Sequence, residues 1–405
     1  MQTNLSKQFR HTPLGEEADA ILRSCVHCGF CTATCPTYQL LGDELDGPRG
    51  RIYLIKQMLE GDTVTVETQR HLDRCLTCRA CETTCPSGVR YGRLADIGRE
   101  VVEQRVSRSV LQRIKRWLLR KIIAYPSRFR LIVMLGRILK PVTPKHLRQK
   151  IPARQRLIKP RQLTSSRSML LLAGCAQQVT TPRTNQAAQA IFAQLGVKLL
   201  EVPEAVCCGS LSLHLAQPEE ARDFMRRNID VWWPYIEKGA EAIVVTASGC
   251  GTAIKDYGEL LKHDTQYAEK AQRISELAKD LSEVLQQESI ETLAIKPPQQ
   301  KVAFHSPCTL QHGQQLHGVV ENILTSVGFK LVDITDAHLC CGSAGTYSIL
   351  QAEISQQLLQ NKLANLQQEN PDIIATANVG CQLHLETKAR VPVKHWVELI
   401  YEAMS

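Results

Sequence analysis

The sequence predicts an α+β protein of several domains, in which a helical domain with two cysteine motifs precedes two repeated α/β units. Three observations lead to this prediction. Eight of the 16 cysteines lie between positions 25 and 85, and the other eight lie between positions 175 and 381. The stretch between the two sets is strongly basic. Residues 166–405 repeat one order of strands, helices and cysteines.

Length and composition exclude several classes of protein. At about 100–200 residues per domain, 405 residues correspond to two to four domains. The sequence has no apolar run long enough to span a membrane, and its first twenty residues lack the apolar stretch of a secretory signal. We therefore expect a cytoplasmic protein. In a reducing compartment, 16 cysteines are more typical of metal or redox sites than of disulfides.

Residues 1–105 are predicted to form the helical domain, which contains the pattern C-x2-C-x2-C-x3-C-P twice, 50 residues apart. This spacing is typical of two [4Fe–4S] clusters, in which the fourth cysteine of each motif ligates the other cluster. Structural zinc is the alternative, but a zinc ribbon needs neither the third cysteine nor the C-P ending. The predicted ligands are Cys25, Cys28, Cys31 and Cys85 for cluster 1, and Cys75, Cys78, Cys81 and Cys35 for cluster 2.

Residues 106–165 are predicted to form a basic amphipathic connector. Val110, Ile114 and Trp117 share one face of its first helix, and Arg113 and Arg116 lie on another. Residues 104–200 contain 21 Lys and Arg and no acidic residue, so the formal charge of +9 combines +21 here with −12 elsewhere. A membrane surface or an acidic partner subunit would bind such a segment. Nucleic acid is not expected as a partner, because no nucleic-acid-binding fold accompanies the charge. A linker that is merely solvated is the remaining interpretation of this segment.

Residues 166–290 and 291–405 are predicted to form two βαβαβ units, each with the sequence Cys-Cys-Gly after its second strand. We call them the first and second CCG units. Their cysteines follow strand ends, where open α/β sheets place functional sites. Three interpretations remain: a further iron–sulfur site, a redox-active thiol pair, or buried remnants of an ancestral site. The residues are Cys175, Cys207, Cys208 and Cys250 in the first unit, and Cys308, Cys340, Cys341 and Cys381 in the second.

Three histidines near the second set of CCG cysteines have either a functional or an ordinary packing role. His305, His338 and His384 lie near the second set of CCG cysteines and are candidate ligands or proton carriers, although each is individually more typical of a packed or surface histidine. No G-x-G-x-x-G or Walker loop is found, so the sequence offers no flavin or nicotinamide site and no catalytic residue. Removal of hydride from a substrate therefore requires another chain.

The stretches RSCVHCGFCTATCPTYQLLGDELDGPRG, HLDRCLTCRACETTCPSGVRY and HLCCGSAGTY resemble a known family. The sequence is similar to iron–sulfur subunits of heterodisulfide reductase, anaerobic glycerol-3-phosphate dehydrogenase and lactate-utilisation complexes, and most of all to those of bacterial glycolate oxidase. The resemblance implies a helical ferredoxin-like domain and electron transfer beside a flavoprotein that oxidises glycolate to glyoxylate. A membrane quinone or another acceptor would take the electrons, and binding of the basic segment to anionic lipid predicts a peripheral position on the inner face of the cytoplasmic membrane.

The likeness to heterodisulfide reductase has one departure. That family ends each CCG unit with C-x-x-C, whereas Cys250 is followed by Gly-Thr-Ala and Cys381 by Gln-Leu-His. Two alternatives to a glycolate oxidase subunit remain. One is the equivalent subunit of a lactate or glycerol-3-phosphate dehydrogenase complex, and the other is a thiol–disulfide reductase that uses the CCG cysteines.

Overall fold

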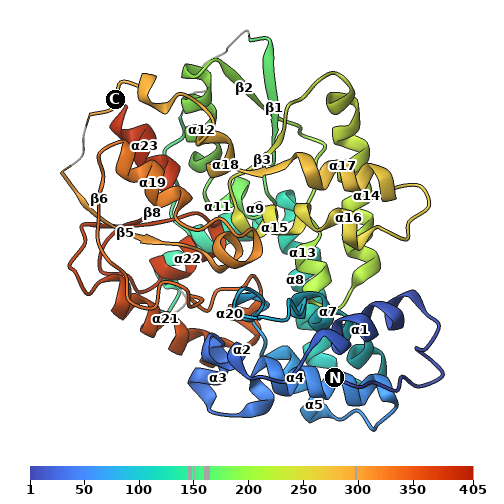
Figure 1. Ribbon diagram of the computed structural model, residues 1–405. Helices are drawn as coiled ribbons and strands as arrows, with labels where there is room; N and C mark the ends of the chain where they lie inside the picture. Colours follow the sequence, from blue (N-terminus) through green and yellow to red (C-terminus); the bar gives the residue numbers. More distant parts are fainter. Residues whose placement is uncertain (145–147, 150, 159–164, 297–298, 405) are drawn as a thin grey trace.

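The N-terminal domain of the computed structural model is entirely helical, as predicted. The structure describes residues 1–405 except 145–147, 150, 159–164, 297–298 and 405. Figure 1 shows the helical domain in blue, below the two α/β units. Its helices are α1 (Pro13–Ser24), α2 (Phe30–Ala33), α3 (Pro36–Leu41), α4 (Pro48–Glu60), α5 (Val66–Asp73), α6 (Ala80–Thr83) and α7 (Tyr91–Arg105).

Helix α4 shows how the sequence encodes this domain. Pro48 stands at its first position, where the missing amide proton costs nothing, and Gly61 ends it with a left-handed φ of 108°. Ile52, Ile55 and Met58 recur at helical spacing and form a buried apolar stripe on this helix. This stripe packs on α7 and joins the main core of the helical domain. The cysteine-bearing helices α2 and α6 contact α4 and α7, respectively.

The basic connector begins with two helices, α8 (Val110–Ile123) and α9 (Pro126–Leu139). Arg116 Nη2 lies 2.8 Å from a carboxylate oxygen of Asp73, and Arg120 and Lys121 pair with Glu220. Much of the positive face of α8 is therefore neutralised within the protein. The apolar face of the helix points to solvent instead. Residues 159–164 of the predicted connector lie outside the described residues.

The first CCG unit contains a four-stranded parallel sheet in the order β2-β1-β3-β4. Its strands are β1 (Arg167–Leu171), β2 (Val197–Glu201), β3 (Ile243–Val245) and β4 (Ala278–Asp280). Its helices are α11 (Gln177–Thr180), α12 (Arg183–Gln194), α13 (Ser210–His214), α14 (Pro218–Glu237), α15 (Ser248–Lys255), α16 (Tyr257–Leu260), α17 (Ala268–Leu277) and α18 (Leu281–Leu285).

The second CCG unit repeats this topology, with the parallel order β6-β5-β7-β8. Its strands are β5 (Lys301–His305), β6 (Lys330–Leu331), β7 (Ile373–Thr376) and β8 (Val393–His395). Its helices are α19 (Val319–Ser326), α20 (Tyr347–Leu350), α21 (Ala352–Leu366), α22 (Val379–Glu386) and α23 (Trp396–Ala403). The α+β class and the duplicated α/β unit are thus confirmed. Each unit also has a fourth strand beyond the predicted three.

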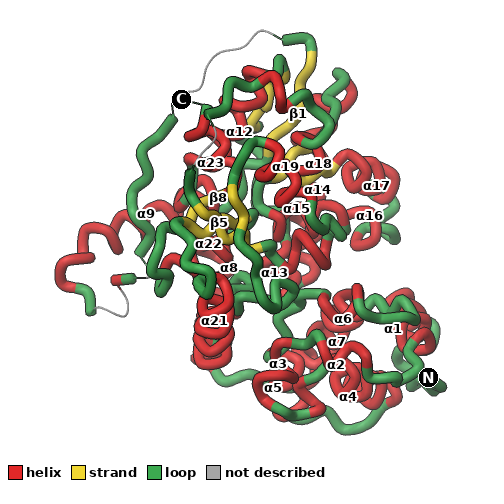
Figure 2. The backbone as a smooth tube through the Cα atoms, turned by 60° about the vertical axis from the view of Figure 1, so that its left-hand side comes forward, coloured by secondary structure: helices red, strands yellow, loops and turns green. Residues whose placement is uncertain are grey.

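The two CCG units share one hydrophobic core and meet at the carboxyl ends of their strands. Phe192 of the first unit packs in the same cluster as Phe304 and Trp396 of the second. The Ser248 amide donates to the Ala377 carbonyl at 3.1 Å. The helical domain lies against the same end of the sheets and contains no strand, as Figure 2 shows. Among the described residues, no helix has the length and apolar character needed to cross a membrane.

Candidate iron–sulfur sites

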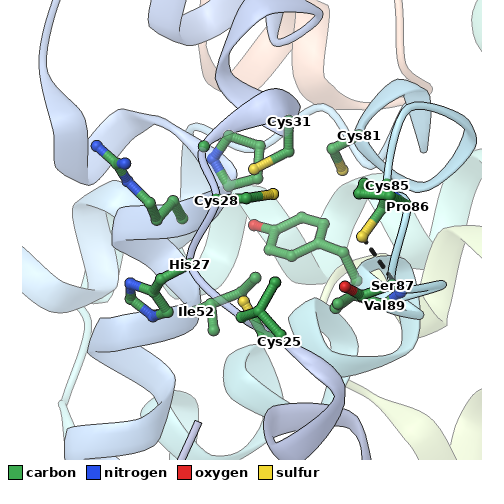
Figure 3. Close-up of a pocket in the computed structure, with 15 residues that line it drawn as sticks. Cys25, His27, Cys28, Cys31, Ile52, Cys81, Cys85, Pro86, Ser87 and Val89 are labelled. Atoms are coloured by element: carbon green, nitrogen blue, oxygen red, sulfur yellow. Dashed lines mark hydrogen bonds between the residues drawn. The ribbon is translucent and has the colours of Figure 1, made fainter.

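The four thiols predicted to hold cluster 1 line one hollow, although one of them comes from the second motif. Cys25, Cys28 and Cys31 come from the loop between α1 and α2 and from α2 itself, and Cys85 follows α6. Figure 3 shows these side chains around a common space, with Cys81 at its edge. Burial raises the pKa of the Cys31 thiol to about 11. A bound cation would relieve this cost by accepting the thiolate.

The backbone of the two cysteine loops repeats an unusual conformation. His27 and Gly29 have φ of 58° and 88°, and Thr77 and Arg79, 50 residues later, have φ of 52° and 60°. Left-handed residues alternating with right-handed ones turn successive amides toward one point, which is a known device for binding anions and Fe–S clusters. The Thr77 amide donates to Cys75 Sγ at 3.3 Å. The loops thus fit an iron–sulfur cluster in donor atoms and in backbone.

The four thiols predicted to hold cluster 2 also gather, deeper in the domain. Cys35 and Cys81 are buried and Cys78 is half-buried. Burial raises the pKa of Cys78 well above its usual value, and the nearby thiols of Cys308, Cys35 and Cys75 add to the effect. Burial does the same for Cys81, whose neighbours include Cys78, Cys75 and Cys35. Several thiolates close together repel one another. The positive charge of the iron ions in a bound cluster would offset this repulsion.

Two buried arginines beside this second set were not found by sequence reasoning. Arg51 Nε donates to the His71 carbonyl at 2.8 Å, and Arg99 Nη2 donates to the Cys75 carbonyl at 2.6 Å. Burial alone would raise the pKa of the Cys75 thiol, but Arg51 and Arg99 lower it below its usual value. Both arginines thus favour negative charge at this set. Sequence reasoning could not find them, because the fold alone brings their partners to them, which include backbone carbonyls and the side chains of Thr37 and Thr77.

The cysteines of the first CCG unit form a continuous row of contacts. Cys207 interacts with Cys175 and Cys208, and Cys208 interacts with Cys250. The contacts with Cys175 and Cys208, together with burial, raise the pKa of Cys207 well above its usual value. The adjoining core cluster contains Ala124 and Tyr125 of the corner between α8 and α9. The four predicted residues are thus brought together.

The second CCG unit gathers its cysteines in the same order. Cys308 Sγ and Cys340 Sγ are 3.8 Å apart, Cys340 contacts Cys341, and Cys341 contacts Cys381. The glycine of the Cys-Cys-Gly motif is required here, because Gly342 has a φ of 85° and an added Cβ would lie 2.7 Å from the Ser355 carbonyl oxygen. Gly209 is the equivalent residue in the first unit, with a φ of 88°.

The second CCG unit lies directly against the second cysteine motif. Cys78 packs in one apolar cluster with Cys308 and Cys340. Across the same interface, Thr83 Oγ1 is 2.9 Å from His312 Nδ1. The predicted cluster 2 set and the second CCG set are therefore neighbours, a relation that the sequence separation of more than 200 residues conceals.

The histidines near the cysteine sets differ in their surroundings. His27 lines the cluster 1 hollow. His305 lies with Cys341 and Cys381. His384 Nε2 is 3.2 Å from Ser355 Oγ, and the His338 carbonyl contacts His312 Nε2 at 3.0 Å. Burial lowers the pKa of His305 well below its usual value, so its ring is neutral.

Comparison with protein families supports the two kinds of site. A family described as "4Fe-4S dicluster domain" matches residues 21–89. A family described as "Cysteine-rich domain" matches twice, over residues 169–255 and 302–386. The fold and the cysteine sets thus define an iron–sulfur protein with a dicluster domain and two cysteine-rich repeats.

Similar curated proteins narrow this class. The chain is 54% identical over its whole length to "Glycolate oxidase iron-sulfur subunit" of Escherichia coli, of which it covers 99%. It is 30% identical, over 94% of each chain, to "Probable glycolate oxidase iron-sulfur subunit" of Bacillus subtilis. "Lactate utilization protein A" of Anoxybacillus flavithermus is 27% identical over 58% of this chain. The chain belongs to the family of glycolate oxidase iron–sulfur subunits and is a subunit of an oxidoreductase complex.

A solved structure shares the overall fold. The crystal structure of a hypothetical protein from Helicobacter pylori matches with a TM-score of 0.56. The match covers 98% of this chain and 74% of the other. The sequence identity is 11%, so the likeness concerns the fold alone.

Proposed function

We propose that this chain is the electron-transfer subunit of a complex in which a flavoprotein partner oxidises glycolate to glyoxylate. The observation that carries the proposal is the convergence of thiols from both N-terminal motifs on one hollow, in a chain 54% identical to a glycolate oxidase subunit. When bound, the two [4Fe–4S] clusters would supply one-electron carriers between the flavin and an acceptor. The ligands are those predicted above.

The surface beside Cys28 is the proposed docking site for the flavoprotein. Cys28 is exposed, unlike most of the other cysteines. Val26 and Phe30, its neighbours in the loop, are 66% and 62% exposed. Large apolar side chains at such exposure are typical of interface cores. A partner that covers this loop would bring its flavin close to the first cysteine set.

A membrane surface is the proposed site of the acceptor, and α8 and α9 are proposed to contact it. Twelve of the nineteen large hydrophobic side chains that are exposed among the described residues lie between Val110 and Val142. Basic residues flank them, including Arg113 and Arg130. An apolar face with basic flanks matches the anionic headgroup region of a bilayer. The quinone pool in such a bilayer would accept the electrons.

Paired cysteine variants test the interleaved ligand sets. Cys28→Ser with Cys85→Ser should remove about four iron per chain relative to the wild type, because both thiols belong to cluster 1. The matched pair Cys28→Ser with Cys35→Ser should remove about eight, because it affects both clusters. Iron analysis and EPR of anaerobically purified protein measure the difference. The reverse order of losses would show that each motif holds its own cluster and would refute the proposed ligand sets.

A further inference from the structure

His305 lies beside the thiols of the second CCG unit, and one of its ring nitrogens has no hydrogen-bond partner among the described residues. It is the last residue of β5 and is 2% exposed. One ring nitrogen and the sulfurs of Cys341 and Cys381 all lie within 4.8 Å of one another. Among the described residues, His305 Nε2 has no hydrogen-bond partner. A buried polar atom without a partner is destabilising, so a ligand is expected at this imidazole.

The distances match ligands of a shared metal. Sulfur and nitrogen ligands at about 2.0–2.3 Å from a metal must lie within about 4.6 Å of each other. The group of His305, Cys341 and Cys381 is close to this limit without any ion to draw it together. Cys308 and Cys340 continue the row of donors on the other side. Five donors exceed the four that a single structural zinc accepts, which favours a centre with several metal ions.

The first CCG unit lacks this imidazole. His305 stands three residues before Cys308, and the residue three before Cys175 is Leu172. Leu172 is buried in an apolar cluster. The two thiol rows are otherwise built alike, so the duplicated fold provides its own comparison. The histidine is a specific property of the second unit, the one that contacts Cys78.

We propose that the second CCG unit binds an iron–sulfur centre in which His305 is an imidazole ligand beside Cys308, Cys340, Cys341 and Cys381. The inference goes beyond the proposed function, which needs only the two N-terminal clusters. Replacement of thiolate by imidazole raises the reduction potential of iron–sulfur centres, as the Rieske type shows. A centre of higher potential beside the second cysteine motif would suit an electron acceptor within the chain.

The test is pulsed EPR and metal analysis of the full-length chain, purified anaerobically with 14N- or 15N-labelled histidine. The wild type should show strong hyperfine coupling to a histidine nitrogen, which changes with the isotope. His305→Cys should lose this coupling but keep the iron, and its centre should be reduced at lower potential. His305→Leu, which copies Leu172 of the first unit, should lose iron from this site alone.

His395→Gln is the matched control. His395 is buried, its Nε2 lies 2.8 Å from the Thr246 carbonyl, and its Nδ1 accepts from the Val397 amide, so both nitrogens are occupied. This variant should keep the coupling of the wild type. Coupling that persists in His305→Cys, no histidine coupling in any oxidation state of the wild type, or zinc in place of iron would overturn the inference. These readouts need neither partner nor glycolate, so a negative result is distinct from failure of the proposed function.

Discussion

The Tyr347 hydroxyl donates a 3.0 Å hydrogen bond to the carbonyl of Arg74, the residue immediately before Cys75. This bond ties the second CCG unit to the start of the second cysteine motif across 273 positions of sequence. Tyr347 also packs in the apolar cluster that contains Cys78, Cys308 and Cys340. This side chain is therefore one of the contacts that join the two proposed metal sites.

Tyr347→Phe should weaken this connection without removing the ring. The Arg74 carbonyl would lose a buried partner, which costs about 1–3 kcal/mol. We expect the free energy of unfolding to fall by that amount in urea denaturation, with the iron content unchanged. Tyr235→Phe, on an exposed tyrosine, is the control. Equal stability of Tyr347→Phe and wild type would show that the bond contributes nothing.

Gly342→Ala tests the requirement for glycine in the second Cys-Cys-Gly motif. The added methyl group would meet the Ser355 carbonyl oxygen at 2.7 Å, at a φ of 85°. Gly239→Ala is a close control, because Gly239 has a φ of 92° but no atom within 4 Å of the added Cβ. Left-handed strain costs about 1–2 kcal/mol and should affect both variants. Gly342→Ala should show a larger loss in thermal unfolding, and equal losses would contradict the close approach.

Asp280 should make stability depend on pH. Burial raises its pKa from the ordinary 3.8 to about 6, so the folded protein binds a proton more tightly than the unfolded chain. Stability from this group is therefore present below about pH 4 and is lost as pH rises through about 6. Asp280→Asn should flatten the dependence and stabilise the protein at pH 7 by about 1–3 kcal/mol. Gln314 Nε2 donates to the second carboxylate oxygen of Asp280 at 3.3 Å, and loss of this bond in the variant offsets part of the gain.

Urea denaturation of wild type and Asp280→Asn at a series of pH values between 4 and 8 measures this effect. The variant retains a side-chain oxygen that can accept from the Ser282 amide, as Asp280 does at 3.0 Å. A pH dependence that is the same in both proteins would rule Asp280 out as its source.

Leu111→Glu tests the proposed membrane contact of α8. Leu111 is 79% exposed on the apolar face, so the substitution should not disturb packing. A carboxylate there would oppose both insertion and attraction to anionic headgroups. We expect a severalfold loss of cosedimentation with vesicles of anionic phospholipid. Val66→Glu, at an exposed site on α5, should bind like wild type. Equal binding of all three proteins would remove α8 from the contact.

Local patterns in the sequence predicted what depends on neighbours along the chain. The helical spacing of Ile52 and Met58 is enough to place both on one buried face, and the repeated cysteine motif predicts a shared site for Cys25 and Cys85. Strands β4 and β8 were missed because they are three residues long and include Lys279 and Lys394. Such short strands carry no alternating apolar signal.

Relations between distant segments could not be read in this way. The basic residues of α8 face the protein because they pair with Asp73 and Glu220, which the fold brings to the helix from two other domains. Likewise, the sequence shows that His305 precedes Cys308, but only the fold places it beside Cys341 and Cys381. Specific long-range pairing, and not propensity, decides these features.

The central claim is that glycolate oxidation delivers electrons to this chain, and reduction of its iron–sulfur clusters in the intact complex tests it most directly. The complex would be isolated anaerobically from its native cells and mixed with glycolate, lactate or glycerol 3-phosphate. We predict that glycolate bleaches the visible iron–sulfur absorbance and produces the EPR signals of reduced [4Fe–4S] clusters within one turnover. Reduction of the partner flavin with no change in the cluster signals would contradict the account, as would reduction by lactate or glycerol 3-phosphate alone.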